Sequence, residues 1–233
     1  MRALLLAAGF GTRLRPLTDT LPKCLVSING EPLLSKWLNS LNAAGFTEIL
    51  INTHYLSDLV DDFVAANPMR EKIITSYEPK LLGTAGTLRR HRDFLLETGG
   101  ILLHADNYCL ADLEEFLKKH SQRPKQCVMT MMTFETDDPQ SCGIVEIDEV
   151  GVVTEFYEKV LNPPSCRANG AIYILAPSFF DAVNLDDKNF YDISRDIIPT
   201  LIGKIFAHHV AEPLIDIGTM RKLKDAQFSS PDT

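Results

Sequence analysis

A short, continuous apolar segment runs straight into a glycine-rich turn at the start of the chain. The segment covers residues 2–8, and the turn begins with Gly9-Phe10-Gly11. An apolar run without polar alternation is typical of a strand that is covered on both faces, as in a parallel sheet flanked by helices. Glycines directly after such a strand let the backbone approach a ligand closely, and their N–H groups can surround a phosphate. The segment therefore predicts an α/β fold with a phosphate site at one end of its first strand.

Strand and helix patterns alternate along the rest of the first part of the chain. Strands are expected at residues 48–53, 72–77, 101–105 and 127–134, with helices over 32–45, 57–66, 84–95 and near 113–117. This order predicts a Rossmann-like three-layer α/β sandwich with a mostly parallel central sheet. After Pro139 the pattern changes, and residues 143–156 alternate as a small β-hairpin lobe. Further strands are expected at 169–175, 205–210 and 214–217, with helices at 177–183, 193–202 and from Thr219.

Composition excludes several kinds of partner. The chain has 233 residues and a formal net charge of −8, which disfavours binding to nucleic acid. No apolar run approaches the ~18 residues that a membrane span needs. The five cysteines are odd in number and scattered, which favours a reducing, cytoplasmic location.

Two familiar phosphate-binding patterns do not fit the glycine-rich turn. Leu14 stands where the dinucleotide-binding fingerprint needs its third glycine, and Pro16 prevents a helix from beginning there. No Gly-Lys-Ser/Thr follows, so the turn is not a P-loop. Arg13 and Lys23 nevertheless add positive charge beside it. These features argue against a nicotinamide oxidoreductase and favour another kind of phosphate site.

Two aspartates follow apolar strand segments far apart in the sequence. Asp106 follows one strand and Asp216 ends another. Open α/β sheets bind ligands at the carboxyl ends of their strands, so the two carboxylates could meet there and hold one Mg²⁺ together with substrate oxygens. Each aspartate could instead be a turn or helix-capping residue.

Six motifs in order carry a resemblance that spans almost the whole chain. They are Gly9-x-Gly11-Thr12-Arg13 with Pro22-Lys23, Leu82-Gly83-Thr84-Ala85-Gly86, Ala105-Asp106-Asn107, Glu158-Lys159, Asn169-Gly170, and Asp216-Ile217-Gly218-Thr219. Together they resemble the sugar-1-phosphate nucleotidyltransferases, and among these the mannose-1-phosphate and manno-heptose-1-phosphate guanylyltransferases. The resemblance implies that a sugar-1-phosphate oxygen attacks the α-phosphorus of a nucleoside triphosphate and that pyrophosphate is released.

The resemblance also implies which residues form the site. Arg13, Lys23 and Asp106 would be catalytic, and Asp106 and Asp216 would hold Mg²⁺. Residues implied to bind the nucleotide are Leu6, Ala7, Ala8, Gly9, Gly11, Thr12, Arg13, Lys23, Glu78, Gly83, Thr84 and Ala85. Residues implied to bind the sugar phosphate are Asn107, Gly143, Glu158, Lys159 and Asn169.

Glu78 predicts the base of the nucleotide. Relatives that use uridine or thymidine triphosphates often have a glutamine five positions before the glycine that is Gly83 here. An ionised carboxylate only accepts hydrogen bonds, and guanine offers two adjacent donors that it could bind together. The sequence therefore favours GTP, with a uridylyl- or thymidylyltransferase as the alternative. Glu78 could instead point to solvent.

The expected organisation is a single catalytic domain over residues 1–228, with a frayed tail at 229–233. Its nucleotide-binding part would span about 1–138 and its sugar-phosphate-binding part about 139–228. No hexapeptide repeats follow, so the sequence favours a free-standing catalytic domain that binds small-molecule substrates, with a homodimer possible by base rate. The rival interpretation is a non-catalytic regulatory subunit, which predicts losses at Arg13, Lys23, Asp106 or Asp216; all four are present.

Overall fold

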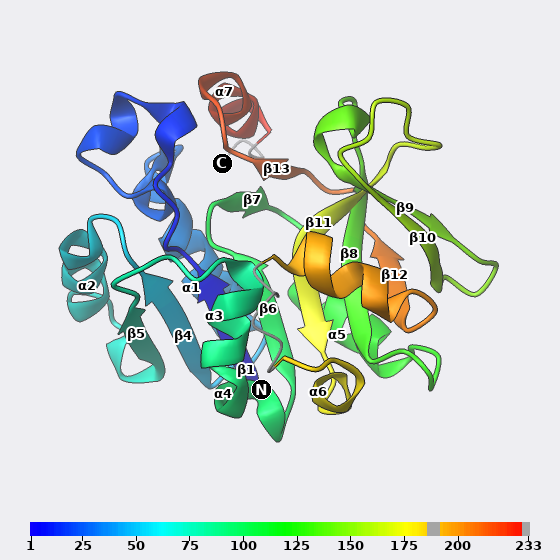
Figure 1. Ribbon diagram of the computed structural model, residues 1–233. Helices are drawn as coiled ribbons and strands as arrows, with labels where there is room; N and C mark the ends of the chain where they lie inside the picture. Colours follow the sequence, from blue (N-terminus) through cyan, green and yellow to red (C-terminus); the bar gives the residue numbers. More distant parts are fainter. Residues whose placement is uncertain (186–191, 230–233) are drawn as a thin grey trace. The chain divides into compact units, whose positions relative to one another are not determined.

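The computed structural model of the protein describes residues 1–185 and 192–229 (Figure 1). Contacts within the chain divide it into two compact units, each formed by more than one segment. The first unit holds the described residues of Met1–Leu81, Leu103–Ala111 and Glu212–Thr233, and the second holds those of Leu82–Leu102 and Asp112–Ala211. The division of the domain near residue 138 stays a prediction. Residues 230–233 of the predicted tail lie outside the described residues.

The first unit contains the parallel sheet that the opening segment predicts. Its elements in chain order begin with β1 (Arg2–Leu6), α1 (Leu33–Ala43), β4 (Glu48–Thr53), α2 (Ser57–Ala65) and β5 (Ile73–Tyr77). Strand β1 pairs in parallel with β4, and β4 pairs in parallel with β5. Leu6 lies opposite Asn52 in this register. Because the strand residues from Ala3 to Leu5 are completely buried, the sheet forms the core of this unit.

Helix α1 shows how local sequence sets an element's position. Its apolar residues recur at helical spacing, and Leu34, Trp37 and Leu41 are buried. Gly45 ends the helix with a φ of +80°, a left-handed conformation that glycine adopts without strain. The Gly45 N–H donates to Asn42 O, and the Phe46 N–H donates to Leu41 O, which closes the last turn. The chain then enters β4 directly.

The remaining elements of the first unit are short. They are the 3₁₀ turns η1 (Thr12–Leu14), η2 (Leu17–Asp19), η3 (Lys23–Leu25) and η4 (Arg70–Lys72), the strands β2 (Ser27–Ile28), β3 (Glu31–Pro32), β7 (Asn107–Cys109) and β13 (Leu214–Asp216), and helix α7 (Met220–Phe228). Strand β13 pairs antiparallel with β7, so Asp216 lies opposite Asn107. Leu14, Tyr108 and Leu223 belong to one buried apolar cluster, which ties the turns, β7 and α7 together.

The second unit contains a mixed sheet. Its elements are α3 (Thr84–Arg90), α4 (Arg92–Leu96), α5 (Leu113–Ser121), β8 (Met129–Glu135), η5 (Pro139–Ser141), β9 (Gly143–Ile147), β10 (Val153–Glu158), β11 (Arg167–Leu175), α6 (Phe179–Ala182), η6 (Ile193–Ile197), η7 (Ile198–Leu201) and β12 (Ile205–His209). Strand β8 pairs antiparallel with β11 and parallel with β12. Strand β9 pairs antiparallel with β10 and β11, which forms the predicted hairpin. Strand β6 (Gly100–His104) carries the chain from the second unit back into the first.

The structure confirms the predicted α/β fold and corrects two predicted helices. The helix expected over 84–95 is interrupted at His91, which separates α3 from α4. The helix expected over 193–202 is a π-helical turn followed by a 3₁₀ turn. Pro199 has no N–H to donate and cannot continue a regular α-helix there.

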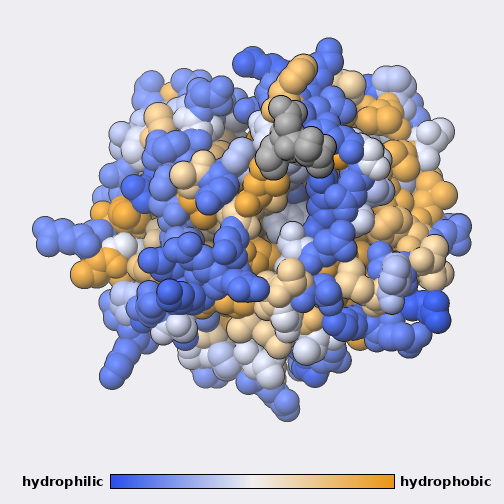
Figure 2. All heavy atoms as spheres, turned by 180° about the vertical axis from the view of Figure 1, so that it is seen from behind, coloured by the Kyte–Doolittle hydropathy of each residue, from blue (hydrophilic) through white to orange (hydrophobic). Residues whose placement is uncertain are grey.

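The described surface is mixed in polarity. In Figure 2, hydrophilic side chains are interspersed with smaller apolar areas on the face seen from behind. Within the described residues, no helix is both long enough and apolar enough to cross a membrane.

Candidate active site

The glycine-rich turn of the first unit leaves β1 where the sequence predicts it. Ala7 N–H donates to Asn52 Oδ1 over 2.7 Å, which fixes the start of the turn to the end of β4. Gly11 has a φ of +63°, and a Cβ there would lie 3.0 Å from Thr18 Cγ2. Thr18 Oγ1 in turn donates to Gly11 O over 2.8 Å. A side chain at position 11 would therefore strain the turn and crowd the residue that holds it.

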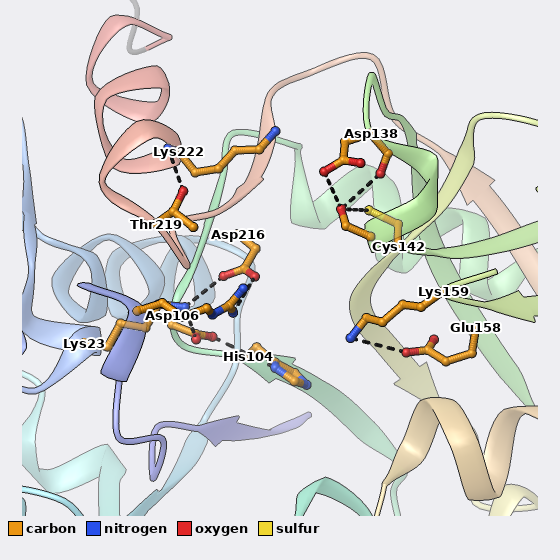
Figure 3. Close-up of polar contacts among 12 residues, drawn as sticks. Lys23, His104, Asp106, Asp138, Cys142, Glu158, Lys159, Asp216, Thr219 and Lys222 are labelled. Atoms are coloured by element: carbon orange, nitrogen blue, oxygen red, sulfur yellow. Dashed lines mark hydrogen bonds and ion pairs between the residues drawn. The ribbon is translucent and has the colours of Figure 1, made fainter. Parts of the chain in front are cut away.

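Two aspartates meet beside this turn, and a lysine lies between them. Lys23 Nζ is 2.5 Å from Asp106 Oδ2 and 2.8 Å from Asp216 Oδ1 (Figure 3). Ala105 N–H donates to Leu6 O, which places Asp106 at the end of β1, and the pairing of β13 with β7 brings Asp216 to the same place. The predicted meeting of the two carboxylates thus occurs within one compact unit.

The Arg13 side chain reaches the same cluster because Gly218, which has no side chain, leaves room for it. Its Nη2 lies 3.6 Å from Asp216 Oδ2. A Cβ on Gly218 would lie only 2.7 Å from this Nη2, so a side chain at position 218 would displace the guanidinium. The Arg13 side chain is 69% exposed, which leaves its positive charge available to a ligand.

The attraction between opposite charges outweighs burial and holds the Lys23–Asp106 pair in its ionised form. Burial by itself would lower the pKa of Lys23, but Asp106 and Asp216 outweigh this effect and raise the pKa above the ordinary value of 10.5. Burial would likewise raise the pKa of Asp106, but the positive charge of Lys23, supported by His104, keeps the pKa below 3.8. The buried Lys23 ammonium and the Asp106 carboxylate therefore face each other as charged groups at neutral pH.

The donor set fits a divalent cation that is shared with a substrate. The Nζ contacts show that one cationic group can touch both carboxylates at once. Mg²⁺ is usually held by one or two carboxylates, with waters and phosphate oxygens as its other ligands. No group of three or more His, Cys, Asp or Glu side chains able to hold a metal occurs among residues 1–185 and 192–229. The carboxylate pair is therefore suited to a metal ion that phosphate oxygens also bind.

The second unit brings together four of the five residues predicted for the sugar phosphate. Glu158 of β10 lies opposite Gly143 of β9, and the neighbouring pair Ala168 and Ile144 places Asn169 of β11 beside Gly143 on its other side. Directly opposed residues project from the same face of a sheet. A Cβ on Gly143 would lie 2.8 Å from Glu158 Oε2. Gly143 therefore leaves room for the Glu158 carboxylate to extend across β9 towards Asn169.

Lys159 supplies the positive charge in this unit. Its Nζ lies 3.5 Å from Glu158 Oε1, and its side chain is 55% exposed (Figure 3). The Lys159 N–H donates to Cys142 O over 3.1 Å, and its φ is +52°. A non-glycine residue in this conformation is strained, and such strain gathers at functional sites. Lys159 and Glu158 thus form an ion pair in which the lysine side chain stays accessible to solvent.

The other predicted residues have more specific surroundings. Glu78 does not point to solvent: it is completely buried, and its Oε1 accepts a hydrogen bond from Asn52 Nδ2 over 3.1 Å. Thr84, which follows Gly83 at the start of α3 and precedes Ala85, accepts a hydrogen bond from the Ile193 N–H. Asn107 is buried and belongs to the first unit, whereas the other residues predicted for the sugar phosphate belong to the second unit.

The structure adds residues that the sequence interpretation did not select. Asn52 contacts both Ala7 and Glu78, and Gly218 makes room for Arg13. His104 Nδ1 lies 4.0 Å from Asp106 Oδ1. Asn52 is a polar residue near the end of the buried strand β4, and this position could have marked it as a candidate site residue from the sequence. For Gly218 the signal lay within a motif that had already been recognised.

A glycine-rich turn beside two carboxylates and two cationic side chains, in an α/β fold, is suited to binding phosphate groups. The family model described as "Nucleotidyl transferase" matches residues 2–231. The chain belongs to the nucleotidyl transferase family.

Curated relatives and solved structures agree with this assignment. A mannose-1-phosphate guanylyltransferase 1 from Arabidopsis thaliana is 34% identical over an alignment of 232 residues that covers 95% of this chain and 62% of the relative. A mannose-1-phosphate guanylyltransferase catalytic subunit beta from Xenopus tropicalis is 31% identical over 225 residues, covering 94% of this chain and 61% of that protein. The chain thus spans less than two thirds of the length of these relatives.

Among solved structures, HddC from Yersinia pseudotuberculosis complexed with GMP-PN has a TM-score of 0.79 and 25% identity, covering 97% of this chain and 98% of that one. A Bacillus anthracis protein solved in complex with sucrose has a TM-score of 0.86, covering 100% of this chain and 96% of that one. Its 21% identity shows a shared fold only.

Proposed function

We propose that the protein joins a sugar 1-phosphate to a nucleoside triphosphate and releases pyrophosphate. The observation that carries this proposal is the cluster of Lys23, Asp106 and Asp216 beside the glycine-rich turn, with Arg13 in contact with it. The relatives named mannose-1-phosphate guanylyltransferases support it further.

The reaction requires positioning and charge more than proton transfer. An oxygen of the sugar phosphate forms a bond to the α-phosphorus, and the bond from that phosphorus to the oxygen bridging to the β-phosphorus breaks. That oxygen and its electron pair leave with pyrophosphate. Because the attacking phosphate oxygen is already ionised at neutral pH, no side chain has to remove its proton. The main barrier is the approach of two anions, which fixed cations lower.

Arg13 and Lys23 are suited to neutralising the negative charge of different phosphates of the nucleotide. Arg13 is exposed, and its guanidinium can bind the outgoing β- and γ-phosphates in a bidentate manner. Lys23 is buried and held by two carboxylates, so its ammonium has a fixed place near the α-phosphate. Lys23 thereby offsets the charge that shifts at the α-phosphorus.

Asp106 and Asp216 are the residues that would hold Mg²⁺. When bound there, the ion supplies positive charge to phosphate oxygens and helps to orient them. The two carboxylates would bind this ion, and the Lys23 ammonium would stay beside them, near the nucleotide phosphate.

The residues of the second unit fit the sugar phosphate. Lys159 provides an exposed cation for the phosphate. Glu158 and Asn169, on either side of Gly143, offer a carboxylate and an amide to sugar hydroxyls. We propose mannose 1-phosphate or a manno-heptose 1-phosphate as the sugar, on the strength of the motif resemblance and the names of the relatives.

GTP is the nucleotide that we propose, with UTP and dTTP as alternatives. The Glu78 carboxylate matches the paired donors of guanine. Because Glu78 is buried against Asn52, it can contact a base only if its segment shifts when the nucleotide binds. The names of the relatives favour GTP independently of Glu78.

A matrix of pyrophosphate release tests the proposal. Each of GTP, UTP, dTTP, CTP and ATP is mixed with mannose, manno-heptose, glucose and N-acetylglucosamine 1-phosphates in the presence of Mg²⁺. We expect release to be fastest for GTP with a manno-configured sugar. A folded protein that releases pyrophosphate from no combination would contradict the proposal and favour a regulatory role.

A further inference from the structure

Strand β11 is interrupted where it carries Asn169. Its pairing with β8 shifts between Asn169 and Tyr173, and Ala171 within this bulge has a φ of +54°. The Ala171 N–H donates to Asn169 Oδ1 over 2.9 Å, and Asn169 Nδ2 donates to the Tyr173 hydroxyl over 2.8 Å. The bulge therefore fixes both ends of the Asn169 amide.

Tyr173 is a rigid anchor for this contact. Its side chain is only 1% exposed, and its hydroxyl is also hydrogen-bonded to Ser194 of η6. Burial raises the pKa of Tyr173, so the hydroxyl stays protonated at neutral pH. The ring cannot turn away without disturbing the core of the second unit, and the hydroxyl position is set accordingly.

The amide of Asn169 keeps hydrogen-bonding capacity towards a ligand. A primary amide has two N–H donors and two acceptor positions, and the contacts with Tyr173 and Ala171 use one of each. The remaining donor and acceptor match a sugar hydroxyl, which both donates and accepts. Asn169 is partly exposed, on the same face of the sheet as Glu158. The direction of its amide therefore decides how well such a hydroxyl can be bound.

We propose that Tyr173 is a positioning residue for the sugar phosphate and acts by orienting the Asn169 amide. This inference rests on the proposed function, because it assigns the ligand of Asn169 as a sugar hydroxyl. Tyr173 itself would not touch the substrate.

Tyr173→Phe removes the hydroxyl and keeps the ring. We expect the KM for mannose 1-phosphate to rise about 3–10-fold, the value of a single lost neutral hydrogen bond, while the KM for GTP stays unchanged. Tyr108→Phe is the matched control, because Tyr108 is equally buried and its hydroxyl has no hydrogen-bond partner within the described part of the chain. Thermal unfolding of each variant sets a working temperature well below the lowest midpoint.

A double-mutant cycle separates positioning from a general loss of structure. In the Asn169→Ala background, adding Tyr173→Phe should leave the KM for mannose 1-phosphate within about 2-fold, because the group that Tyr173 orients is already absent. A second rise of the same size as in the native background would overturn the proposal. So would a rise in the KM for GTP that matches the rise for the sugar phosphate.

Calorimetry distinguishes failure of this inference from failure of the proposed function. Binding of mannose 1-phosphate is measured for the native protein and the variants with a non-hydrolysable GTP analogue present. If the native protein releases no pyrophosphate, the proposed reaction fails. The positioning role would still be supported if Tyr173→Phe bound mannose 1-phosphate more weakly while Tyr108→Phe bound it as the native protein does. Equal binding by native protein, Tyr108→Phe and Tyr173→Phe would overturn it.

Discussion

Lys23 Nζ and Asp106 Oδ2 are 2.5 Å apart although 83 positions separate the two residues in the sequence. The contact fastens η3 to the end of β6, and its lysine is nearly inaccessible to solvent. Asp216 shares the same ammonium group. The chain thus carries its own counter-ion for the carboxylate pair, and this ammonium group holds the two aspartates close together.

Replacing Asp106 by Asn tests the role of this pair. The variant keeps the shape of the side chain but removes one charge, so we expect a folded protein whose turnover falls by about 10²–10³. Turnover is measured by pyrophosphate release at saturating GTP and sugar phosphate. Asp58→Asn, on the exposed face of α2, removes the same charge and should leave turnover unchanged. Normal turnover by Asp106→Asn would contradict the assignment.

Lys23→Ala should affect turnover more than the KM for GTP. Its ammonium is needed most when charge shifts at the α-phosphorus. Its loss therefore raises the free energy of the transition state more than that of the bound substrate. Arg13→Ala should weaken GTP binding as well as turnover. Steady-state kinetics of both variants, with the exposed Lys118→Ala as the control, measure the split. A pure KM effect in Lys23→Ala would make Lys23 a tether for the ground state.

Gly143→Ala should disturb the sugar side of the site and the fold around it. The new Cβ would lie 2.8 Å from Glu158 Oε2 and 2.6 Å from the Phe156 ring. We expect a higher KM for the sugar phosphate and a free energy of unfolding lower by about 1–3 kcal/mol, as for other overpacked sites. Kinetics and denaturant unfolding measure the two effects. A variant with native KM and native stability would show that Glu158 does not extend across β9.

Glu78→Gln isolates the charge of Glu78 from its structural contact. The Gln side chain retains an Oε1 that can accept from Asn52 Nδ2, so the buried contact survives the change. If the carboxylate binds guanine, its loss should lower the preference for GTP over UTP by about 10–100-fold, the worth of a charge-assisted hydrogen bond. The ratio of kcat/KM values for GTP and UTP is the measurement. An unchanged ratio would assign Glu78 to supporting the glycine-rich turn through Asn52.

His120 predicts an acid-sensitive second unit. Burial first, and then the charge of Arg123, lower the pKa of His120 from 6.5 to about 4, and its Nδ1 lies 2.7 Å from Thr130 Oγ1. Between pH 6.5 and about pH 4 the unfolded chain binds more protons than the folded one. The free energy of unfolding should therefore fall as the pH drops through this range.

The contribution of His120 is fully retained above pH 6.5 and lost below about 4. We expect a loss of about 1–3 kcal/mol over this range. Denaturant unfolding at several pH values, compared with His120→Gln, measures it. A native protein and a variant with parallel pH profiles would contradict the prediction.

Much of the first unit could be predicted because its signals are local. The β1 segment is apolar throughout, and α1 has a regular apolar face and a glycine at its end. The interruption of the helix at His91 carries no Gly or Pro signal. The parallel pairing of β12 with β8 also depends on long-range packing that local patterns do not encode.

The site likewise combines features that local motifs predict with contacts that depend on long-range packing. Motifs located Arg13, Lys23, Asp106 and Asp216, and the structure brings these four together. Motifs gave no sign that Lys23 would bridge the two aspartates, because that contact depends on how β13 meets β7. Contacts that act through a second residue, such as Tyr173 with Asn169, become visible only in the folded chain.

The most direct test of the proposed reaction follows the α-phosphate of GTP. The protein is incubated with mannose 1-phosphate, Mg²⁺ and GTP labelled at the α-phosphate, and the products are identified by mass spectrometry. We predict that the label appears in a guanosine diphosphate sugar and that an equimolar amount of unlabelled pyrophosphate is released. Label found only in GMP or GDP, or remaining in GTP, would contradict transfer to the sugar phosphate.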